Sequence, residues 1–387
     1  MMEQAVDDWV EQMKEKAKQP PPPNPEAEKV KLEAEGMKAQ SADIKERLNL
    51  LAASLQEVEA EERAHLIALP NTPHHSVTAG KSADDNEVVT TWGHPPVLEE
   101  GFVPHWELTD RYKLIDFERG VKITGAGFPV YTGQGARLQR ALIQFFLDRN
   151  TAAGYLEVQP PHFINEASGF GTGQLPDKEG QMYHMTEDNL YAIPTAEVPV
   201  TNLLRDEIVP EADLPIKMTA YSPCFRREAG SYGKDVRGLN RLHQFDKVEI
   251  VCVEHPSKSY DRLEEMVAHV AGLLQDLGLH YRILRLCGGD MGFTSALTYD
   301  FEVWSAAQER WLEVSSVSNF ETFQSNRLML RYRSTEDQKP HLAHTLNGSA
   351  LALPRIVAAL LENNQGPEGI VITEVLHSYT GFDHISA

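Results

Sequence analysis

Basic side chains gather in residues 225–247, where six Lys or Arg stand against three Asp or Glu although the whole chain carries a net charge of −21. Glycines in the first half of this segment predict a loop, and the alternation that follows predicts a strand. Such a hairpin would place Arg226 and Glu228 beside Phe245 and Glu249. Its arginines could hold a polyanion while the aromatic ring stacks on a base. The same pattern also fits a solvated charged hairpin.

A carboxylate and two hydroxyls follow one another in the strand-like run Glu313-Val314-Ser315-Ser316. Alternation puts Glu313 and Ser315 on one face, so a bulge or a twist is needed before Ser316 can join Glu313. Carboxylate and hydroxyl oxygens suit a Mg²⁺ ion that shares its coordination shell with phosphate. Taken alone, a glutamate on a strand more commonly faces solvent.

A third group of polar residues lies in 344–355, HTLNGSALALPR. This run predicts the end of a strand, a turn at Gly348 and the start of a helix. Arg355, near that start, could grip a terminal phosphate at the positive end of the helix dipole. The alternative is an arginine on the solvent face of the helix.

Periodicity in the segments around these residues predicts a mixed fold. Helices are expected at 134–152, 256–278 and 350–363, and strands at 155–158, 189–193, 244–253, 280–286, 298–304 and 311–317. Neighbouring strands joined by short turns indicate an antiparallel sheet rather than regular βαβ alternation. No GxGxxG loop follows a strand and no GxxxxGK[ST] loop occurs, which excludes the two common glycine-rich nucleotide loops.

Residues 26–69 predict one long helix, because no proline interrupts them before Pro70. A coiled-coil seam with 4-3-4-3 spacing runs along it through Ile44, Leu48, Leu51, Leu55 and Val58. A helix of roughly 60 Å needs a partner for such a seam. The candidate partner, residues 2–18, is less than half as long and has one apolar face, made of Val6, Trp9, Met13 and Ala17. A simple dimerisation rod is the alternative.

The composition describes a globular chain of 387 residues, 41% hydrophobic and 24% charged, with room for one large domain and a smaller part. The 57 Asp and Glu against 36 Lys and Arg exclude nucleic-acid binding by bulk positive charge and leave room for a local basic patch. Three dispersed cysteines predict buried thiols. Because no apolar run could span a membrane and no signal peptide is recognisable, we expect a cytoplasmic protein without membrane contact.

Five segments together resemble the class II aminoacyl-tRNA synthetases and, among these, the bacterial-type seryl-tRNA synthetases. In chain order they are TAEVP at 195–199, FRREAGSYGKDVRGLNRLHQFDKVE at 225–249, LCGGDMGF at 286–293, EVSSVSNF at 313–320 and HTLNGSALALPR at 344–355. The resemblance covers roughly residues 70–387. It implies an α+β fold, in which an antiparallel six-stranded sheet with flanking helices follows an N-terminal helical, coiled-coil arm.

By this resemblance the chain divides into a tRNA-binding arm at 1–69, a linker at 70–104 and a class II catalytic domain at 105–387. The arm departs from the family pattern, because its first helix is shortened or divergent. The segment 154–161 resembles the family's dimer-interface motif, and the apolar helix before it, 134–152, has more apolar surface than one face usually buries. We therefore expect a homodimer.

The implied reaction joins L-serine to tRNA(Ser), and also to tRNA(Sec), in two steps: ATP, with Mg²⁺, converts serine to seryl-adenylate, and a terminal tRNA hydroxyl then takes the seryl group. The resemblance assigns catalytic roles to Arg226, Glu313 and Arg355. It assigns ATP binding to Arg226, Arg227, Glu228, Leu242, Phe245, Glu313, Val314, Ser315, Ser316 and Arg355. It assigns serine binding to Thr195, Ala196, Glu197, Arg226, Glu249 and Ser349, and Mg²⁺ binding to Glu313 and Ser316.

Two other functions stay open at this point. The same core could form seryl-adenylate but use tRNA poorly, or use another acceptor, if the altered arm no longer guides tRNA. It could also be a non-enzymatic binding protein, although the retained Arg226, Glu313 and Arg355 argue against that. Specificity for threonine or proline is disfavoured by the serine-type segments at 195–197 and 347–349.

Overall fold

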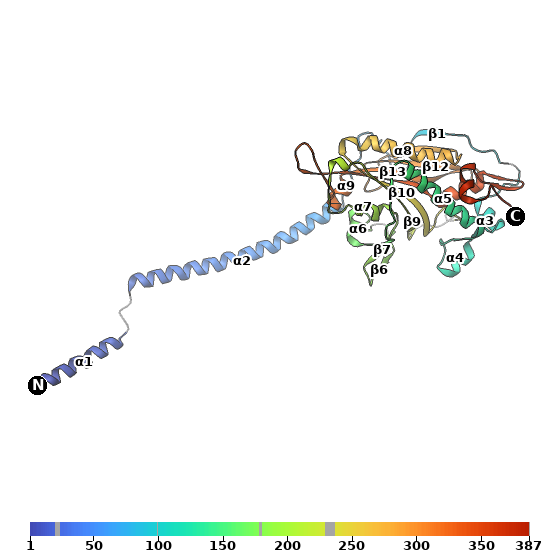
Figure 1. Ribbon diagram of the computed structural model, residues 1–387. Helices are drawn as coiled ribbons and strands as arrows, with labels where there is room; N and C mark the ends of the chain where they lie inside the picture. Colours follow the sequence, from blue (N-terminus) through green and yellow to red (C-terminus); the bar gives the residue numbers. More distant parts are fainter. Residues whose placement is uncertain (20–23, 99, 178–179, 229–236, 387) are drawn as a thin grey trace. The chain divides into compact units, whose positions relative to one another are not determined.

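The computed structural model describes residues 1–19, 24–98, 100–177, 180–228 and 237–386. The chain divides into two compact units, Met1–Pro70 and Asn71–Ala387. The first unit holds two helices, α1 (Met2–Lys18) and α2 (Pro25–Ile67), which are labelled in Figure 1. The second unit holds all of the strands in the described part of the chain.

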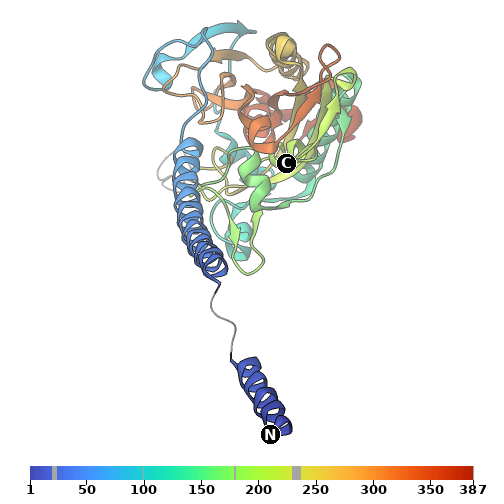
Figure 2. The ribbon, with the colours of Figure 1, turned by 90° about the vertical axis from the view of Figure 1, so that its left-hand side faces the viewer.

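Helix α2 confirms the long helix expected from the sequence. Its start is set by Asn24, whose side chain accepts a hydrogen bond from the Glu26 amide at 3.1 Å, and by Pro25 in the first turn. The helix then runs without a break, as Figure 2 shows. The seam residues of α2 are 56–65% exposed, so the seam is open to an incoming surface.

The second unit is built on an eight-stranded sheet in the order β1-β11-β12-β13-β16-β10-β9-β4. Its strands, in chain order, are β1 (Glu87–Trp92), β4 (Leu156–Glu157), β9 (Ile216–Phe225), β10 (Gln244–Glu254), β11 (Tyr281–Arg285), β12 (Leu297–Ser305), β13 (Arg310–Glu321) and β16 (His344–Ala352). The six central strands are antiparallel, which confirms the expected sheet. Two edge strands extend it, β1 antiparallel to β11 and β4 parallel to β9. The segment expected to be a linker thus contributes β1 to the sheet, and all six residues of that strand are exposed.

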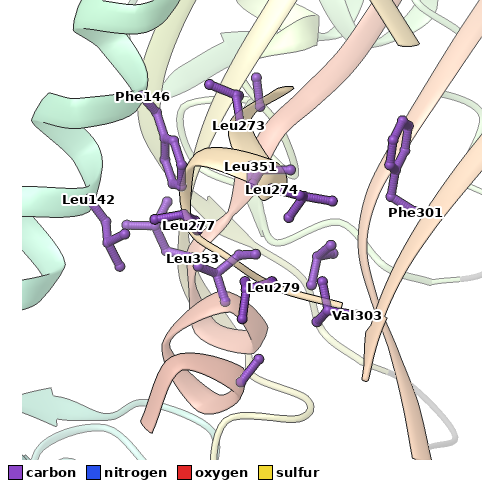
Figure 3. Packing of buried hydrophobic residues seen from close by; sticks show 14 of the residues in the cluster. Leu142, Phe146, Leu273, Leu274, Leu277, Leu279, Phe301, Val303, Leu351 and Leu353 are labelled. Carbon is purple, nitrogen blue, oxygen red and sulfur yellow. The ribbon is translucent and has the colours of Figure 1, made fainter. Parts of the chain in front are cut away.

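Three helices cover one face of this sheet and bury the main core. They are α5 (Gly133–Ala152), α8 (Ser259–Asp276) and α10 (Leu353–Asn363), and they contact strands β9, β10, β12, β13 and β16. Figure 3 shows Phe146 of α5, Leu277 at the end of α8 and Leu353 of α10 meeting on one side of this cluster, with Phe301 of β12 on its other side. Because the helices occupy this face, the opposite face is the one left for polar chemistry.

Shorter elements complete the second unit. The helices are α3 (His105–Arg111), α4 (Phe117–Ile123), α6 (Glu166–Gly171), α7 (Glu197–Asn202), α9 (Phe323–Leu328) and α11 (His377–Thr380). Small sheets join β2 (Ile115–Asp116) with β3 (Val130–Tyr131), β5 (Phe163–Asn165) and β6 (His184–Met185) with β7 (Leu190–Ala192), β8 (Ile208–Pro210) and β15 (Pro340–Leu342) with β14 (Arg331–Arg333), and β17 (Gln365–Gly366) and β19 (His384–Ile385) with β18 (Gly369–Val371). No helix in the described part of the chain is long and apolar enough to cross a membrane. The three cysteines are free and buried, as expected.

Two expectations about local structure were wrong. Gly348 does not form a turn, because β16 continues to Ala352 and α10 begins at Leu353. A Cβ atom at Gly348 would lie 3.1 Å from a Val317 methyl group, so the glycine permits close packing beside β13 instead. The apolar side chains of α5 also do not require a partner subunit, because Phe145 and Phe146 are buried in the chain's own core.

Candidate active site

A cavity of about 610 Å³ opens on the face of the sheet opposite the core helices. Strand β10 shows the division, because Phe245 and Lys247 line the cavity while Val248 and Ile250 belong to the core. Glu249 follows in the same row and forms an ion pair with Lys247, so its carboxylate lies just behind the cavity wall.

Two buried carboxylates lie together at the cavity, Glu197 of α7 in its lining and Glu249 of β10 directly behind the lining. The Asn347 side-chain amide donates to both, at 2.9 Å to Glu197 and 2.8 Å to Glu249. Thr195 donates through its hydroxyl to Glu249 at 3.1 Å, and Gln324 donates to Glu197 at 2.7 Å. The resulting pocket is small and rich in hydrogen-bond acceptors, which suits an ammonium group and a hydroxyl on a small molecule.

The two carboxylates have different electrostatic environments. Lys247 forms an ion pair with Glu249, and both side chains are almost fully buried. Burial and the neighbouring charge of Glu249 raise the pKa of Glu197 to about 7, while hydrogen bonding from Gln324 opposes the shift. Near neutral pH, protonation or deprotonation of Glu197 therefore changes the charge of the pocket.

The outer part of the cavity combines aromatic and basic side chains. The guanidinium of Arg226 lies 5.3 Å from the centre of the Phe245 ring. The Phe245 backbone pairs with Cys224, so the two ends of the expected hairpin meet here. Glu249 pairs with Ala220 instead, and Glu228 forms an ion pair with Arg241. The hairpin is therefore confirmed for Arg226 and Phe245, whereas Glu228 does not lie beside Glu249, and residues 229–236 of its loop lie outside the described part of the chain.

A β-bulge brings Glu313 and Ser316 to the same side of β13. Along β12, Glu302 pairs with Glu313 and the adjacent Phe301 pairs with Ser315, so Val314 is the extra residue. Val314 and Ser315 turn inward and are buried, and the Ser315 hydroxyl donates to the Ser349 carbonyl at 2.5 Å. The bulge expected from the sequence is therefore present, and it places the Glu313 carboxylate and the Ser316 hydroxyl on one face of β13.

Asp300, on the neighbouring strand β12, pairs with Ser316 and brings a further carboxyl group near Glu313. One of its carboxylate oxygens is buried without a hydrogen-bond partner, and burial together with Glu313 raises the pKa of this carboxyl. No group of three or more His, Cys, Asp or Glu residues in the described ranges is arranged to hold a metal ion. A cation at Glu313 and Ser316 would therefore need further oxygen ligands from a bound phosphate chain, which is the coordination that Mg²⁺ prefers.

Arg355 projects from the first turn of α10 to the cavity wall. Its Nε donates to the Asn240 carbonyl at 3.1 Å, and a terminal nitrogen donates to the Glu313 carbonyl at 2.7 Å. The Glu313 carboxylate lies 3.8 Å from the same nitrogen. These contacts hold the guanidinium beside the candidate metal ligands, where a phosphate chain would pass.

The structure brings most of the predicted site residues into this one cavity. Its lining includes Thr195, Glu197, Arg226, Glu228, Leu242, Phe245, Glu313, Val314, Ser315, Ser316, Ser349 and Arg355. Three predicted residues do not line it. Glu249 is buried behind the wall, where its carboxylate accepts hydrogen bonds from two lining residues, Thr195 and Asn347. Ala196 is buried among apolar neighbours at the start of α7, and Arg227 is exposed, with its backbone amide donating to the Gln181 carbonyl at 2.9 Å.

Four residues of the site were not predicted. Lys247 could have been found, because it alternates with Phe245 and Glu249 on a strand that the sequence predicts. Asn347 lies in a segment that was recognised, but its carboxylate partners come from distant parts of the chain. Gln324, in the six-residue α9, and Asn240, after the hairpin loop, carry no periodic signal.

Comparison with known proteins identifies the family of this chain. Residues 182–364 match the tRNA synthetase class II core domain (G, H, P, S and T). A serine–tRNA ligase of Salinibacter ruber is 57% identical over 356 residues, covering 92% of this chain and 83% of the relative. The chain belongs to the serine–tRNA ligase family. A serine–tRNA ligase of Geobacter sulfurreducens is 50% identical, over 89% of this chain and 82% of its own length.

A solved structure supports the same conclusion for the fold of this ligase. The seryl-tRNA synthetase of Pyrococcus horikoshii, complexed with ATP, superimposes with a TM-score of 0.86 at 35% identity, covering 90% of this chain and 83% of that one. The fold expected from the sequence, an antiparallel class II sheet with flanking helices, is therefore confirmed.

Replacing Glu197 by Gln should flatten the pH dependence of stability. Because the folded-state pKa of Glu197 is about 7 and its ordinary value is 4.5, the folded chain binds more protons than the unfolded chain between these values. The free energy of unfolding contributed by this group is therefore highest below pH 4.5 and is lost as the pH rises to about 7. Thermal unfolding of wild type and E197Q at pH 5 and pH 8 measures the effect, and an equal change in Tm for both proteins would contradict it.

Proposed function

We propose that this chain activates L-serine with ATP and transfers the seryl group to tRNA(Ser) and tRNA(Sec), with adenylate formation in the cavity described above. The observation that carries this proposal is the shared cavity itself. A group of buried acceptors at Glu197 and Glu249 adjoins a wall of arginine and aromatic side chains suited to a nucleotide. Membership of the serine–tRNA ligase family supports the same reaction.

The first step needs no nucleophile from the protein. A serine carboxylate oxygen attacks the α-phosphorus of ATP, the bond from that phosphorus to the bridging oxygen breaks, and pyrophosphate leaves with the electron pair. The protein's contribution is to hold the reactants together and to stabilise the charge that develops on phosphorus. Arg226 lies over the Phe245 ring and its charge also acts on Glu197, so it is placed to contact both the serine carboxylate and the α-phosphate.

The remaining nucleotide contacts follow from the outer wall of the cavity. Phe245 offers one face to the adenine and Arg355 covers the other, as the family resemblance implies. The Glu228 carboxylate, beside Arg241, is placed to accept from the adenine amino group, and Leu242 offers its backbone. We assign Mg²⁺ to Glu313 and Ser316, where, when bound, it would neutralise phosphate charge.

Selection of serine follows from the buried acceptors. The serine ammonium faces the two carboxylates, and its hydroxyl completes the hydrogen bonding of the same polar groups, which include Thr195 and Ser349. Bound alanine would leave those groups buried without a hydrogen-bond partner. The site should therefore discriminate against alanine more strongly than it could against a substrate that lacks only a methylene group.

Replacing Arg226 by Ala should abolish most adenylate formation. Removing one charge-stabilising donor costs about 3–4 kcal/mol in the transition state, so kcat for serine-dependent pyrophosphate exchange should fall about a hundred- to a thousandfold, with a smaller change in the KM for serine. Arg149 is a matched control, because its guanidinium lies 5.2 Å from the Phe145 ring but outside the cavity. Normal exchange by R226A, or equal losses in R226A and R149A, would refute the assignment.

We also propose that the active protein is a homodimer that contacts its partner through the edge of the sheet at β4. The family resemblance of residues 154–161 supports this, and Leu156 of β4 is 66% exposed although it lies in a strand. Phe163, in β5, is also half exposed. Exposed apolar surface of this kind is typical of an interface between subunits.

Sedimentation at micromolar concentration tests the dimer. Wild type should sediment as a dimer, and Leu156→Lys should shift it towards monomer because a charge would be buried in the interface. Val371→Lys is the control, since Val371 is comparably exposed but belongs to the small sheet of β17, β18 and β19. A monomeric wild type, or the same shift in both variants, would contradict the proposal.

We propose that the first unit binds tRNA through α2, as the arm does in the family. Four lysines lie in its first half, Lys29, Lys31, Lys38 and Lys45, and all are exposed. In a chain with net charge −21, phosphate contacts must come from local groups of this kind. The adenylation residues all lie beyond residue 190, so the two steps can be affected separately.

Replacing the four lysines of α2 together by Ala should weaken tRNA charging and leave pyrophosphate exchange unchanged. For each phosphate that the arm no longer neutralises, the slope of log kcat/KM for tRNA against log salt concentration should become shallower by about one. The control replaces four exposed lysines of the second unit, Lys113, Lys122, Lys258 and Lys339. Charging that is equally affected in both variants, or unaffected in the first, would show that the arm does not hold the tRNA.

A further inference from the structure

A buried histidine joins α3 to the loop that borders the nucleotide side of the cavity. His105, at the start of α3, is fully buried, and its Nε2 accepts a hydrogen bond from the Leu239 backbone amide at 2.8 Å. A backbone amide can only donate, so Nε2 carries no proton and the ring proton is on Nδ1. Nδ1 then donates to the Glu362 carboxylate at 2.6 Å. The ring is therefore neutral and fixed in one tautomer.

The loop that His105 holds makes direct contact with the site. Leu239 and Asn240 line the cavity, and the Asn240 carbonyl accepts the hydrogen bond from Arg355 described above. Gly238 precedes them with φ +66°, and a Cβ atom there would lie 2.3 Å from Nε2 of His105. The loop backbone thus approaches the imidazole as closely as glycine allows.

A second connection reaches the same loop from the turn after β12. The Gln308 side chain donates to the Glu362 carboxylate at 2.9 Å and accepts from the Asn240 side chain at 2.9 Å. Glu362, which is fully buried in α10, also accepts from the His105 backbone amide and from the Ser305 hydroxyl. One carboxylate therefore fixes both His105 and Gln308, and these two residues fix consecutive positions of the loop.

We propose that His105 is a positioning residue for adenylate formation, acting through the Leu239 amide and the Asn240 carbonyl to orient Arg355 towards the nucleotide. It does not touch the substrate, and Gln308 supports the same loop from the other side. The inference rests on the proposed function of the cavity. Its consequence is specific, since the nucleotide contacts depend on the loop while the carboxylate pocket for serine does not.

Two substitutions at His105 separate positioning from simple stabilisation. The amide oxygen of His105→Gln reaches the position of Nε2 and can accept from Leu239, whereas His105→Asn keeps a donor for Glu362 and leaves the buried Leu239 amide unpaired. Positioning predicts that kcat/KM for ATP in pyrophosphate exchange falls about tenfold or more in H105N and is largely restored in H105Q, with the KM for serine unchanged in both. A structural role through Glu362 predicts the reverse order.

Further measurements keep the outcome decisive. Gln308→Ala, in a turn near the surface, should raise the KM for ATP several-fold even if both His105 variants fail to fold. His269→Asn is the control, because His269 donates a comparable hydrogen bond from Nε2 to the Asn150 side-chain oxygen at 2.7 Å, away from the cavity. Unchanged ATP kinetics in Q308A, equal losses in H105N and H105Q, or losses in Tm alone would overturn the proposal. If the proposed function itself were wrong, the result would be different, because wild type would then show no serine-dependent pyrophosphate exchange.

Discussion

The burial of two carboxylates side by side, Glu197 and Glu249, is the constraint around which the site is organised. Neither could hold a full charge there without compensation. Lys247 supplies it for Glu249, the Asn347 amide links the pair, and the raised pKa of Glu197 removes part of the repulsion. The pocket is consequently ready for a small cationic ligand, whose arrival would supply the positive charge that the protein leaves incomplete.

The sheet makes this arrangement possible by keeping its two faces chemically distinct. Alternation along β10 sends Val248 and Ile250 into the core, and it turns Lys247 and Glu249 to the opposite face, where Lys247 lines the cavity and Glu249 is buried beside it. Bulges interrupt the alternation in β13 at Val314 and in β16 between Ser349 and Ala352. At the second bulge Ala350 and Leu351 both enter the core, after which α10 begins and delivers Arg355 to the cavity. The irregular positions are thus the ones that place the phosphate-binding groups.

The central fold and most of the site could be predicted from the sequence because their signals are local. The periodicity of β10, α5 and α8 is plain, and the motif around Arg226 and Phe245 identifies the hairpin that joins β9 to β10. Edge strand β1 could not be predicted, since all its residues are exposed and no alternation marks it. The turn assigned to Gly348 failed for a different reason, because what requires glycine is the approach of Val317 from another strand. Gln324 and His105 act through partners more than 100 residues away, which no local pattern encodes.

Because of the bulge at Val314, the length of the turn between β12 and β13 determines which side chains of β13 face the cavity. These strands are joined by a short turn, from Ala306 to Glu309, so their register is fixed from that end. One residue more or fewer would rotate every side chain of β13 to the opposite face unless the bulge appeared or disappeared with it. Glu313 would then point into the core and Leu312 into the cavity. Apart from Gln308, the turn residues should therefore tolerate a change of identity better than a change in their number.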